Sequence, residues 1–314
     1  MVGAGRFERP TPCAQGRCAT RLRYAPTLTD YSIVNQSTVP PLATLALLLP
    51  PDLERVTDSV WHQIRDIPGY IGDREFRALA MLVVGARGSG VSVEIGSFKG
   101  KSTVGLALLN AHYGLGTVVS IDPHNAPSVT DPFLGNQKSS FEDFQSALRN
   151  AHVTEHVEVH RESSRDAAQG WNRPIRFLWL DGDHTYAGAK LDFDLFSPYL
   201  VDGGMLTLHD TLHEFEGPIR VFVEEMLRSD KFGPAGLLHS IGWAQYRPVD
   251  GGTFRRERQR LARRAERLIP LVANGRKVTG AAKMLWKLQC ALIPHSVLSP
   301  AEWERTLMTE TSSH

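Results

Sequence analysis

The chain of 314 residues has little cysteine, no long apolar run and almost no net charge. Its three cysteines, Cys13, Cys18 and Cys290, form no C-x-x-C pair, so neither a disulfide framework nor a thiolate zinc site is expected, and a cytoplasmic protein is favoured. No apolar stretch approaches the roughly 20 residues of a membrane span, so no transmembrane segment is expected. The formal net charge of +1 gives no reason to expect a nucleic acid partner for the chain as a whole.

The first part of the sequence lacks any sustained helical or strand period. Six prolines interrupt residues 1–50. Residues 5–13 resemble the peptides that result when an RNA gene is read as coding sequence. We therefore expect 1–50 to be a disordered or spurious extension, and the short apolar run 42–49 is a weaker alternative as a signal-peptide core, because no A-x-A site follows it.

The middle of the chain alternates short β-rich runs with helical segments. The predicted strands are 91–95, 117–121, 157–160, 175–180, 205–208, 237–240 and 243–246. The predicted helices are 52–64, 73–84, 102–111, 139–151, 164–169, 187–196 and 218–227. This alternation predicts an α/β fold in residues 51–250, with a doubly wound, seven-stranded, mostly parallel sheet.

Arginine is concentrated after residue 250. Seven arginines fall within 253–269, and apolar residues recur there near helical spacing, which predicts a basic amphipathic helix. A second helix is expected over 281–292, and a capping box at Ser299 predicts a third. The segment 251–314 is therefore expected to be a helical C-terminal appendage. Its arginines either contact an anionic membrane or a partner, or are merely solvated on a helix packed against the core, and a homodimer also stays open.

A glycine loop follows the first predicted strand, in Glu94-Ile95-Gly96-Ser97-Phe98-Lys99-Gly100-Lys101-Ser102. The spacing G-x-x-x-G differs from the G-x-G-x-x-G of dinucleotide-binding folds. It is also one residue short of a P-loop, because Ile95 stands where the first glycine would be. Residues 177–181 look like a Walker B strand, which keeps a P-loop-like nucleotide hydrolase as an alternative. Glu94 opposes it, since a carboxylate repels a triphosphate.

S-adenosylmethionine carries a sulfonium and an ammonium group but no phosphate, so a carboxylate beside the loop would attract it. The pattern E-x-G-x-x-x-G resembles motif I of class I S-adenosylmethionine-dependent methyltransferases. The resemblance implies a Rossmann-like methyltransferase fold with S-adenosylmethionine as cofactor. The residues that it places at the methionine end of the cofactor are Glu94, Gly96, Ser97, Gly100 and Ser102.

The next two strands end on polar residues that suit the nucleoside part of such a cofactor. Asp122 closes the second strand, where an acidic side chain can accept hydrogen bonds from ribose hydroxyls. The third strand runs into Arg161-Glu162-Ser163, which is similar to the G-[DE]-S step that related methyltransferases place against adenine. Glu162 and Ser163 match this step, and Arg161 replaces the glycine.

The fourth and fifth strands end on a longer motif. Asp181-Gly182-Asp183-His184-Thr185-Tyr186 follows one strand, and His209-Asp210 follows the other. This block resembles the signature of the catechol O-methyltransferase-like and macrolide-sugar O-methyltransferase group, and the resemblance extends over 74–248. It implies methylation of a small hydroxylated acceptor such as a sugar or secondary metabolite, with Asp181, Asp183 and His184 as the candidate catalytic residues.

A metal site is the further expectation at this end. Neighbouring strands lie about 5 Å apart, so Asp181 and Asp210 can converge on Mg²⁺ or another divalent cation, with His209 as a third ligand. Many relatives have an Asn or acid where this chain has Thr211, so metal dependence stays open. His184 or Asp183 could deprotonate the acceptor, whereas His213 fits better as a structural histidine bonded to a carboxylate.

Two expectations concern the rest of the domain. The connection 123–137 is long for a strand-to-helix loop and is expected, with the helices before residue 91, to form a lid over the acceptor. The remaining functional alternative is a methyltransferase fold kept as a non-catalytic binding module, in which the basic C-terminal helix would carry the activity.

Overall fold

The computed structural model describes residues 49–125, 138–275, 277–295 and 303. The chain divides into two compact units after Pro40, and every described residue lies in the second. Most of the predicted N-terminal extension, most of the predicted lid loop and the predicted helix after Ser299, except Trp303, lie outside the described residues.

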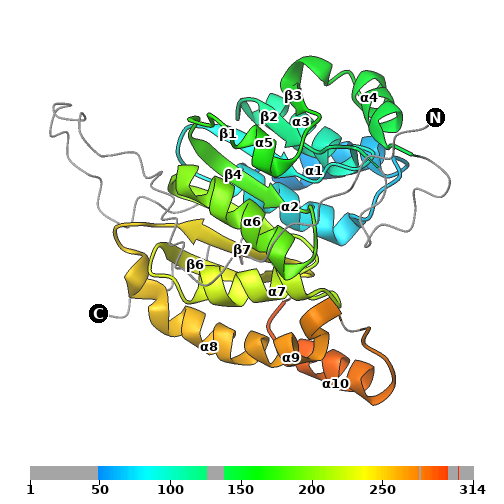
Figure 1. Ribbon diagram of the computed structural model, residues 1–314. Helices are drawn as coiled ribbons and strands as arrows, with labels where there is room; N and C mark the ends of the chain where they lie inside the picture. Colours follow the sequence, from blue (N-terminus) through cyan, green and yellow to red (C-terminus); the bar gives the residue numbers. More distant parts are fainter. Residues whose placement is uncertain (1–48, 126–137, 276, 296–302, 304–314) are drawn as a thin grey trace, which may run out of the picture. The chain divides into compact units, whose positions relative to one another are not determined.

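Seven strands form one sheet in the order β3-β2-β1-β4-β5-β7-β6 (Figure 1). Strands β1 to β5 pair in parallel, and β7 pairs antiparallel with both β5 and β6. This confirms the predicted doubly wound, mostly parallel sheet, whose strand order reverses between β1 and β4. The strands are β1 (Val91–Ile95), β2 (Val118–Ile121), β3 (Val157–His160), β4 (Ile175–Leu180), β5 (Leu200–Leu208), β6 (Phe232–Leu238) and β7 (Ile241–Tyr246).

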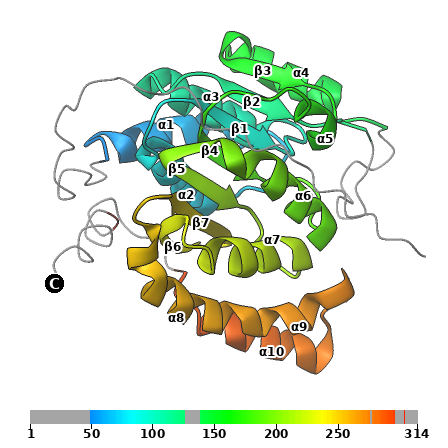
Figure 2. The same cartoon turned by 60° about the vertical axis from the view of Figure 1, so that its left-hand side comes forward.

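Helices cover both faces of the sheet (Figures 1 and 2). Helices α1 to α4 contribute to one hydrophobic core, and α5 to α7 contribute to the other. These helices are α1 (Leu53–Ile64), α2 (Asp73–Gly85), α3 (Lys101–Tyr113), α4 (Phe141–Asn150), α5 (Ser164–Ala167), α6 (Tyr186–Phe196) and α7 (Glu216–Val221). Short helical turns, η3 (Thr154–His156) and η4 (Ser197–Tyr199), precede β3 and β5.

The central strand β4 shows why the sequence folds in this way. All six of its residues are buried, as expected of a parallel strand with helices on both sides. Phe177 and Trp179 belong to the core beneath α1 to α4, whereas Leu178 and Leu180 belong to the core beneath α6 and α7. The alternation of side chains along the strand therefore supplies both cores from one strand, in which Arg176 is the single charged residue.

Three predicted boundaries were wrong near glycine and proline. Strand β5 begins at Leu200, whereas the strand was predicted over 205–208, because it continues through Gly203, which has φ of 78°. Strand β6 begins at Phe232 and includes Pro234, which an edge strand tolerates. The helix predicted over 218–227 is α7 followed by a π-helical segment, η5 (Phe222–Leu227).

The predicted C-terminal helical appendage is present, but the basic helix is shorter than expected. It is α8 (Arg255–Ala265), and the chain continues as a 3₁₀ turn and then α9, which has Pro270 in its first turn. Proline has no N–H to donate, which interrupts one continuous helix here. The elements of this part are η6 (Gly251–Phe254), α8, η7 (Glu266–Leu268), α9 (Ile269–Val272), η8 (Ala273–Gly275) and α10 (Gly280–Ala291).

One arginine of α8 departs from the expectation of a solvated face. Arg258 is buried and donates hydrogen bonds to several backbone carbonyls where η5 ends and β6 begins, including those of Leu227 and Ser229. Those carbonyls would otherwise be buried without donors, so Arg258 fastens α8 to the sheet domain. Among the described residues, no helix is both long and apolar enough to span a membrane.

Candidate active site

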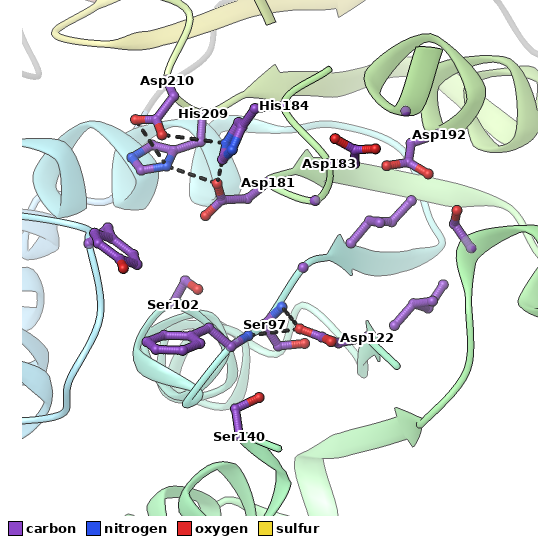
Figure 3. Close-up of a pocket in the computed structure, with 18 of the residues that line it drawn as sticks. Ser97, Ser102, Asp122, Ser140, Asp181, Asp183, His184, Asp192, His209 and Asp210 are labelled. Atoms are coloured by element: carbon purple, nitrogen blue, oxygen red, sulfur yellow. Dashed lines mark hydrogen bonds and ion pairs between the residues drawn. The ribbon is translucent and has the colours of Figure 1, made fainter. Parts of the chain in front are cut away.

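A cavity of 690 Å³ opens where the parallel strands end (Figure 3). Residues that follow β1, β2, β4 and β5 line it, together with residues from the α1–α2 connection and from α6. This is the carboxyl edge of the sheet on both sides of the order reversal, the place where ligands bind in open α/β sheets. The predicted site residues that line it are Gly96, Ser97, Ser102, Asp122, Ser163, Asp181, Asp183, His184, His209 and Asp210.

The loop after β1 depends on two glycines with left-handed backbone. Gly96 has φ of 87°, and a Cβ there would lie 2.1 Å from the backbone oxygen of Asp181, so only glycine fits. Gly100 has φ of 89° and starts α3, but it does not line the cavity, because its Cα faces the ring of Phe144. Its predicted cofactor contact is therefore corrected to a conformational role.

Asp122 holds this loop in place. Its Oδ2 accepts hydrogen bonds from the backbone N–H of Ser97 at 2.8 Å and of Phe98 at 2.9 Å. Its Oδ1 accepts the N–H of His124 at 2.6 Å. The carboxylate at the end of β2 thus fixes the loop at the end of β1, and it also lines the cavity (Figure 3).

The same contacts argue against a P-loop. A phosphate-binding loop leaves its N–H groups available for the phosphate oxygens. Here Asp122 occupies the N–H groups of Ser97 and Phe98 and adds a negative charge beside them. The nucleotide-hydrolase alternative is therefore not favoured.

Glu94 does not line the cavity, which corrects its predicted place beside the cofactor. It is fully buried under α3, and its Oε2 accepts a hydrogen bond from the hydroxyl of Thr103. Burial raises the pKa of its carboxyl to about 8, although hydrogen bonds from Ser102 and Thr103 act in the opposite direction. Because β1 is covered on both faces, its alternate side chains enter the core and cannot turn outward at its end.

Of the two residues predicted to contact adenine, one lines the cavity and the other does not. Glu162 lies outside the cavity lining, and its carboxylate contacts the ring of His160 at 2.8 Å. Ser163 lines the cavity and also caps α5, accepting the N–H of Asp166. Glu162 is diverted because the histidine two residues earlier offers a nearer partner.

Three side chains gather at the other end of the cavity (Figure 3). Asp181, His184 and Asp210 each present a possible ligand atom, and these atoms all lie within 4.8 Å of one another. His184 Nε2 is 3.4 Å from Asp181 Oδ1 and 3.4 Å from Asp210 Oδ2. Both ring nitrogens of His184 are buried without a hydrogen-bond partner, while the ring stacks on Phe215 with centroids 4.6 Å apart. Two carboxylates and an orphaned imidazole form a donor set that fits a divalent cation.

His209 was predicted as the third ligand, and the structure gives this place to His184 instead. The His209 ring is buried, with Nδ1 3.0 Å from Asp181 Oδ1 and 3.6 Å from Asp210 Oδ1. Burial would lower its pKa, but the charges of Asp181 and Asp210 raise it well above the usual value. The raised pKa makes His209 a positive charge behind the two carboxylates, and its ring is not among the three side chains that converge as possible ligands.

The two acids respond to this charge. Burial alone would raise the pKa of Asp181 and that of Asp210, but the positive charge of His209 holds both below their usual value. His213 Nδ1 lies 2.6 Å from Asp210 Oδ1 and helps to keep that acid ionised. Both acids are therefore carboxylates at neutral pH.

Sequence reasoning missed Glu75, which lies on α2 and faces the far side of the His209 ring. Its Oε1 is 3.7 Å from His209 Nε2 and accepts a hydrogen bond from the hydroxyl of Ser240. Burial would raise its pKa, but hydrogen bonding and the charge of His209 lower it to about 2. Glu75 stands in a capping box with Gly72, which explains it locally, so no sequence signal pointed to the site.

Asp183 lies at the cavity but has a structural partner. Its Oδ1 accepts the N–H of Thr185, which in turn caps α6 by accepting the N–H of Gly188. The cavity also has an aromatic wall, in which Tyr70 and Phe98 contact each other with centroids 5.8 Å apart. The sequence indicated Phe98 only as part of the loop, yet the structure makes it part of the cavity lining, as it does Phe215.

Comparison with known proteins agrees with this arrangement. The sequence profile of a methyltransferase domain family matches residues 93–211, from β1 to just beyond β5. This match confirms the resemblance to methyltransferases that the motifs predicted. Residues 93–211 are similar to a methyltransferase domain.

Several solved structures are similar to this chain. The Bacillus cereus O-methyltransferase in complex with SAH is 20% identical, and the match covers 63% of this chain and 93% of that chain, with a TM-score of 0.42. The calicheamicin methyltransferase CalS11 is 19% identical over 62% of this chain and 78% of that chain, with a TM-score of 0.37. The O-methyltransferase TomG from Streptomyces achromogenes, in complex with SAM, is 16% identical over 63% and 90%, with a TM-score of 0.43.

Proposed function

We propose that this chain uses S-adenosylmethionine to methylate a hydroxyl oxygen of a small acceptor, with a divalent cation held by Asp181, His184 and Asp210. The observation that carries the proposal is that this three-residue cluster shares one cavity with the Gly96 loop and Asp122. Sugars and secondary metabolites with adjacent hydroxyls are the acceptor class. Two acceptor oxygens can occupy the positions that the protein ligands leave open.

The cofactor end of the cavity is built to receive a nucleoside without phosphate. The Gly96 backbone allows close approach, and Asp122 offers a carboxylate that could accept hydrogen bonds from ribose hydroxyls. Ser97, Ser102 and Ser163 add hydroxyl groups around it. Glu94 contributes from beneath the loop, since its buried carboxyl keeps Thr103 at the start of α3 in place.

The chemical end positions the acceptor. The cation, when bound, would lower the pKa of an acceptor hydroxyl. Asp181 and Asp210 carry the negative charge that attracts it, and His209 and Glu75 keep those carboxylates oriented from behind. Because methyl transfer is an in-line displacement, this positioning supplies most of the rate.

His184 and Asp183 are the groups that could take the acceptor proton. His184 is a ligand when the cation is present, and its unpartnered nitrogens would make it the base only if methyl transfer needs no cation. Asp183 keeps one carboxylate oxygen that Thr185 does not engage. We assign it as the acceptor-side carboxylate beside the cluster.

Binding measurements test the cofactor first. Calorimetry of the full chain should show binding of S-adenosylhomocysteine and none of ATP, and ATP binding alone would instead support a nucleotide hydrolase. Mn²⁺ titration followed by electron paramagnetic resonance tests the cation, since an oxygen and imidazole donor set suits a first-row ion better than Mg²⁺. His184→Ala should weaken Mn²⁺ binding and leave S-adenosylhomocysteine binding intact.

Chelation then separates the two roles of His184. Treatment with a chelator should stop methyl transfer to a panel of catechols and sugars, and Mn²⁺ should restore it. Turnover that survives chelation and still requires His184 would assign this residue as the base and remove the cation from the proposal.

A further inference from the structure

Helix α10 carries its apolar side chains on the outside. Met284 is 75% exposed, Leu285 43%, Leu288 57% and Leu292, just after the helix, 54%. Only Trp286 of this helix is fully buried, where it joins the core beneath α7 and α9. The second C-terminal helix thus has the apolar side that the sequence predicted. This apolar stripe, however, faces away from the protein.

This outward stripe differs from the single apolar residues that most protein surfaces expose. Single exposed apolar residues are common, but four within nine positions on one helix form a patch that normally has a partner. The chain itself leads elsewhere after α10, because the backbone oxygen of His295 accepts the N–H of His239 and Trp303 packs on Trp243 of β7. The described chain after α10 therefore turns toward the sheet and not onto the stripe.

The charge around the stripe indicates the kind of partner. Between Gly251 and His295 the sequence has eleven lysines and arginines and two glutamates, a formal charge of +9. The whole chain carries +1, so the rest of the molecule is acidic. On α8, which contacts α10 (Figure 2), five arginines are exposed: Arg255, Arg256, Arg260, Arg263 and Arg264.

Basic and apolar side chains occur together on α10 as well. Lys283 and Lys287 are exposed on the same helix as the stripe, and Lys283 also pairs with Glu214. Packed helices lie about 8–10 Å apart, which is close to the screening length of about 8 Å at physiological salt, so the arginines of α8 and the stripe of α10 can act on one surface.

We propose that α10 and α8 dock this protein on an anionic lipid bilayer. The apolar stripe enters the boundary between headgroups and acyl chains, and the exposed arginines and lysines contact the lipid phosphates. A polynucleotide would use the arginines but leave the leucines exposed to water. A lipid surface satisfies both kinds of side chain at once. Docking would bring the methyltransferase domain near acceptors that partition into the bilayer.

Co-sedimentation of the full chain with lipid vesicles tests this proposal. Binding should be strong to phosphatidylcholine vesicles that contain about one third phosphatidylglycerol and weak to phosphatidylcholine alone, and it should fall with added salt. Met284→Gln with Leu288→Gln should reduce binding at least tenfold. Arg260→Gln, Arg263→Gln and Arg264→Gln together should reduce it by roughly fivefold for each arginine.

Matched controls keep the result interpretable. Val249→Gln removes an exposed apolar side chain outside α10, and Arg149→Gln with Arg165→Gln removes exposed arginines on α4 and α5. These variants should bind vesicles as the wild type does. Thermal melts should show that all the variants fold.

Three results would overturn the proposal. Equal binding to both vesicle types would show that the membrane charge plays no part in docking. Unchanged binding by the Met284→Gln, Leu288→Gln variant would show that the apolar stripe plays no part in it. A wild-type chain that is dimeric without lipid, and monomeric in that variant, would assign the stripe to a second copy of the chain. None of these readouts depends on methyl transfer.

Discussion

The two ends of the cavity hold their acidic side chains by different means. At the cofactor end, Asp122 is satisfied by three backbone N–H groups, so the loop and the carboxylate fix each other. At the chemical end, Asp181 and Asp210 depend on other side chains, above all on the buried ring of His209.

This difference matters for what each end can tolerate. Backbone donors stay in place whatever ligand is present, so the cofactor end is preorganised. At the chemical end, negative and positive side chains alternate: Glu75, then His209, then the two acids. Each of them stays charged in a buried place only because its neighbours carry the opposite charge. Changes there should therefore affect chemistry before affinity, and changes at Asp122 should do the reverse.

The largest effect is expected for Asp181→Asn. The amide lacks the charge that attracts a cation and that balances His209, so turnover should fall about a thousandfold. Binding of S-adenosylhomocysteine should change by less than about threefold, because the loop end is intact. Methyl-transfer assays and calorimetry on one preparation check both numbers.

Asp202→Asn serves as its control, since Asp202 is an exposed acid near the other end of β5. Full methyl transfer by Asp181→Asn, in a sample as active as the control, would show that the chemistry does not depend on the Asp181 carboxylate.

Asp122→Asn should give the converse pattern. An amide keeps only one acceptor oxygen, so at least one of the three N–H groups that donate to Asp122 loses its partner, at a cost of about 1–2 kcal/mol in stability. Affinity for S-adenosylhomocysteine should fall between about ten- and a hundredfold, because hydrogen bonds to a charged group are lost.

Calorimetry and thermal melts measure these losses, with Glu158→Gln on the neighbouring strand as the matched change. If affinity were unaffected while turnover fell, the division between the two ends would be wrong.

Glu75→Gln should lower turnover about tenfold without a change in cofactor affinity, since Glu75 orients the cluster through His209. It should also alter the response to acid. A carboxyl with its pKa lowered to about 2 stabilises the fold fully above its unfolded pKa near 4.5, and this contribution, about 3 kcal/mol, is lost as the pH falls toward 2.

Denaturant unfolding between pH 5 and pH 2 should therefore be less pH-dependent in Glu75→Gln than in the wild type. Glu54→Gln, an exposed change on α1, should leave both the slope and the turnover as they are. If the free energy of unfolding changed with pH by the same amount in all three proteins, Glu75 would not interact with the charge of His209.

Asp192→Asn should disturb the site least. It should stabilise the fold at high pH, whereas Glu75→Gln removes a contribution to stability. Burial raises the pKa of Asp192 to about 6, so the folded state holds a proton that the unfolded state loses above about 4. Wild-type stability should fall as the pH rises from 4 to 6, and the neutral amide should recover up to about 3 kcal/mol at pH 8.

Asp194→Asn is the matched control on α6, because Asp194 is exposed and pairs with Lys190. It should cost about 0.5 kcal/mol at most. An Asp192→Asn protein no more stable than the wild type at pH 8 would mean that water or Ser164 already compensates the buried charge.

The sequence by itself determined the sheet and the location of the site. Apolar runs such as β4, separated by helical periods, require parallel strands, and parallel strands bring their carboxyl ends together. Gly96, Asp122, Asp181 and Asp210 could be found because each follows a strand that the pattern located. Boundaries were less certain where Gly203 and Pro234 continue strands that local propensity would end.

Only the tertiary structure decided which side chains reach the cavity. Glu94 is buried because β1 is covered on both faces, and His184 replaces His209 because the latter ring is directed toward Glu75. Glu75 lies 134 positions before His209, and a capping box already explains it locally. Periodicity fixes which face of an element a residue occupies, but the partner across that face comes from packing between distant segments, and no local pattern records it.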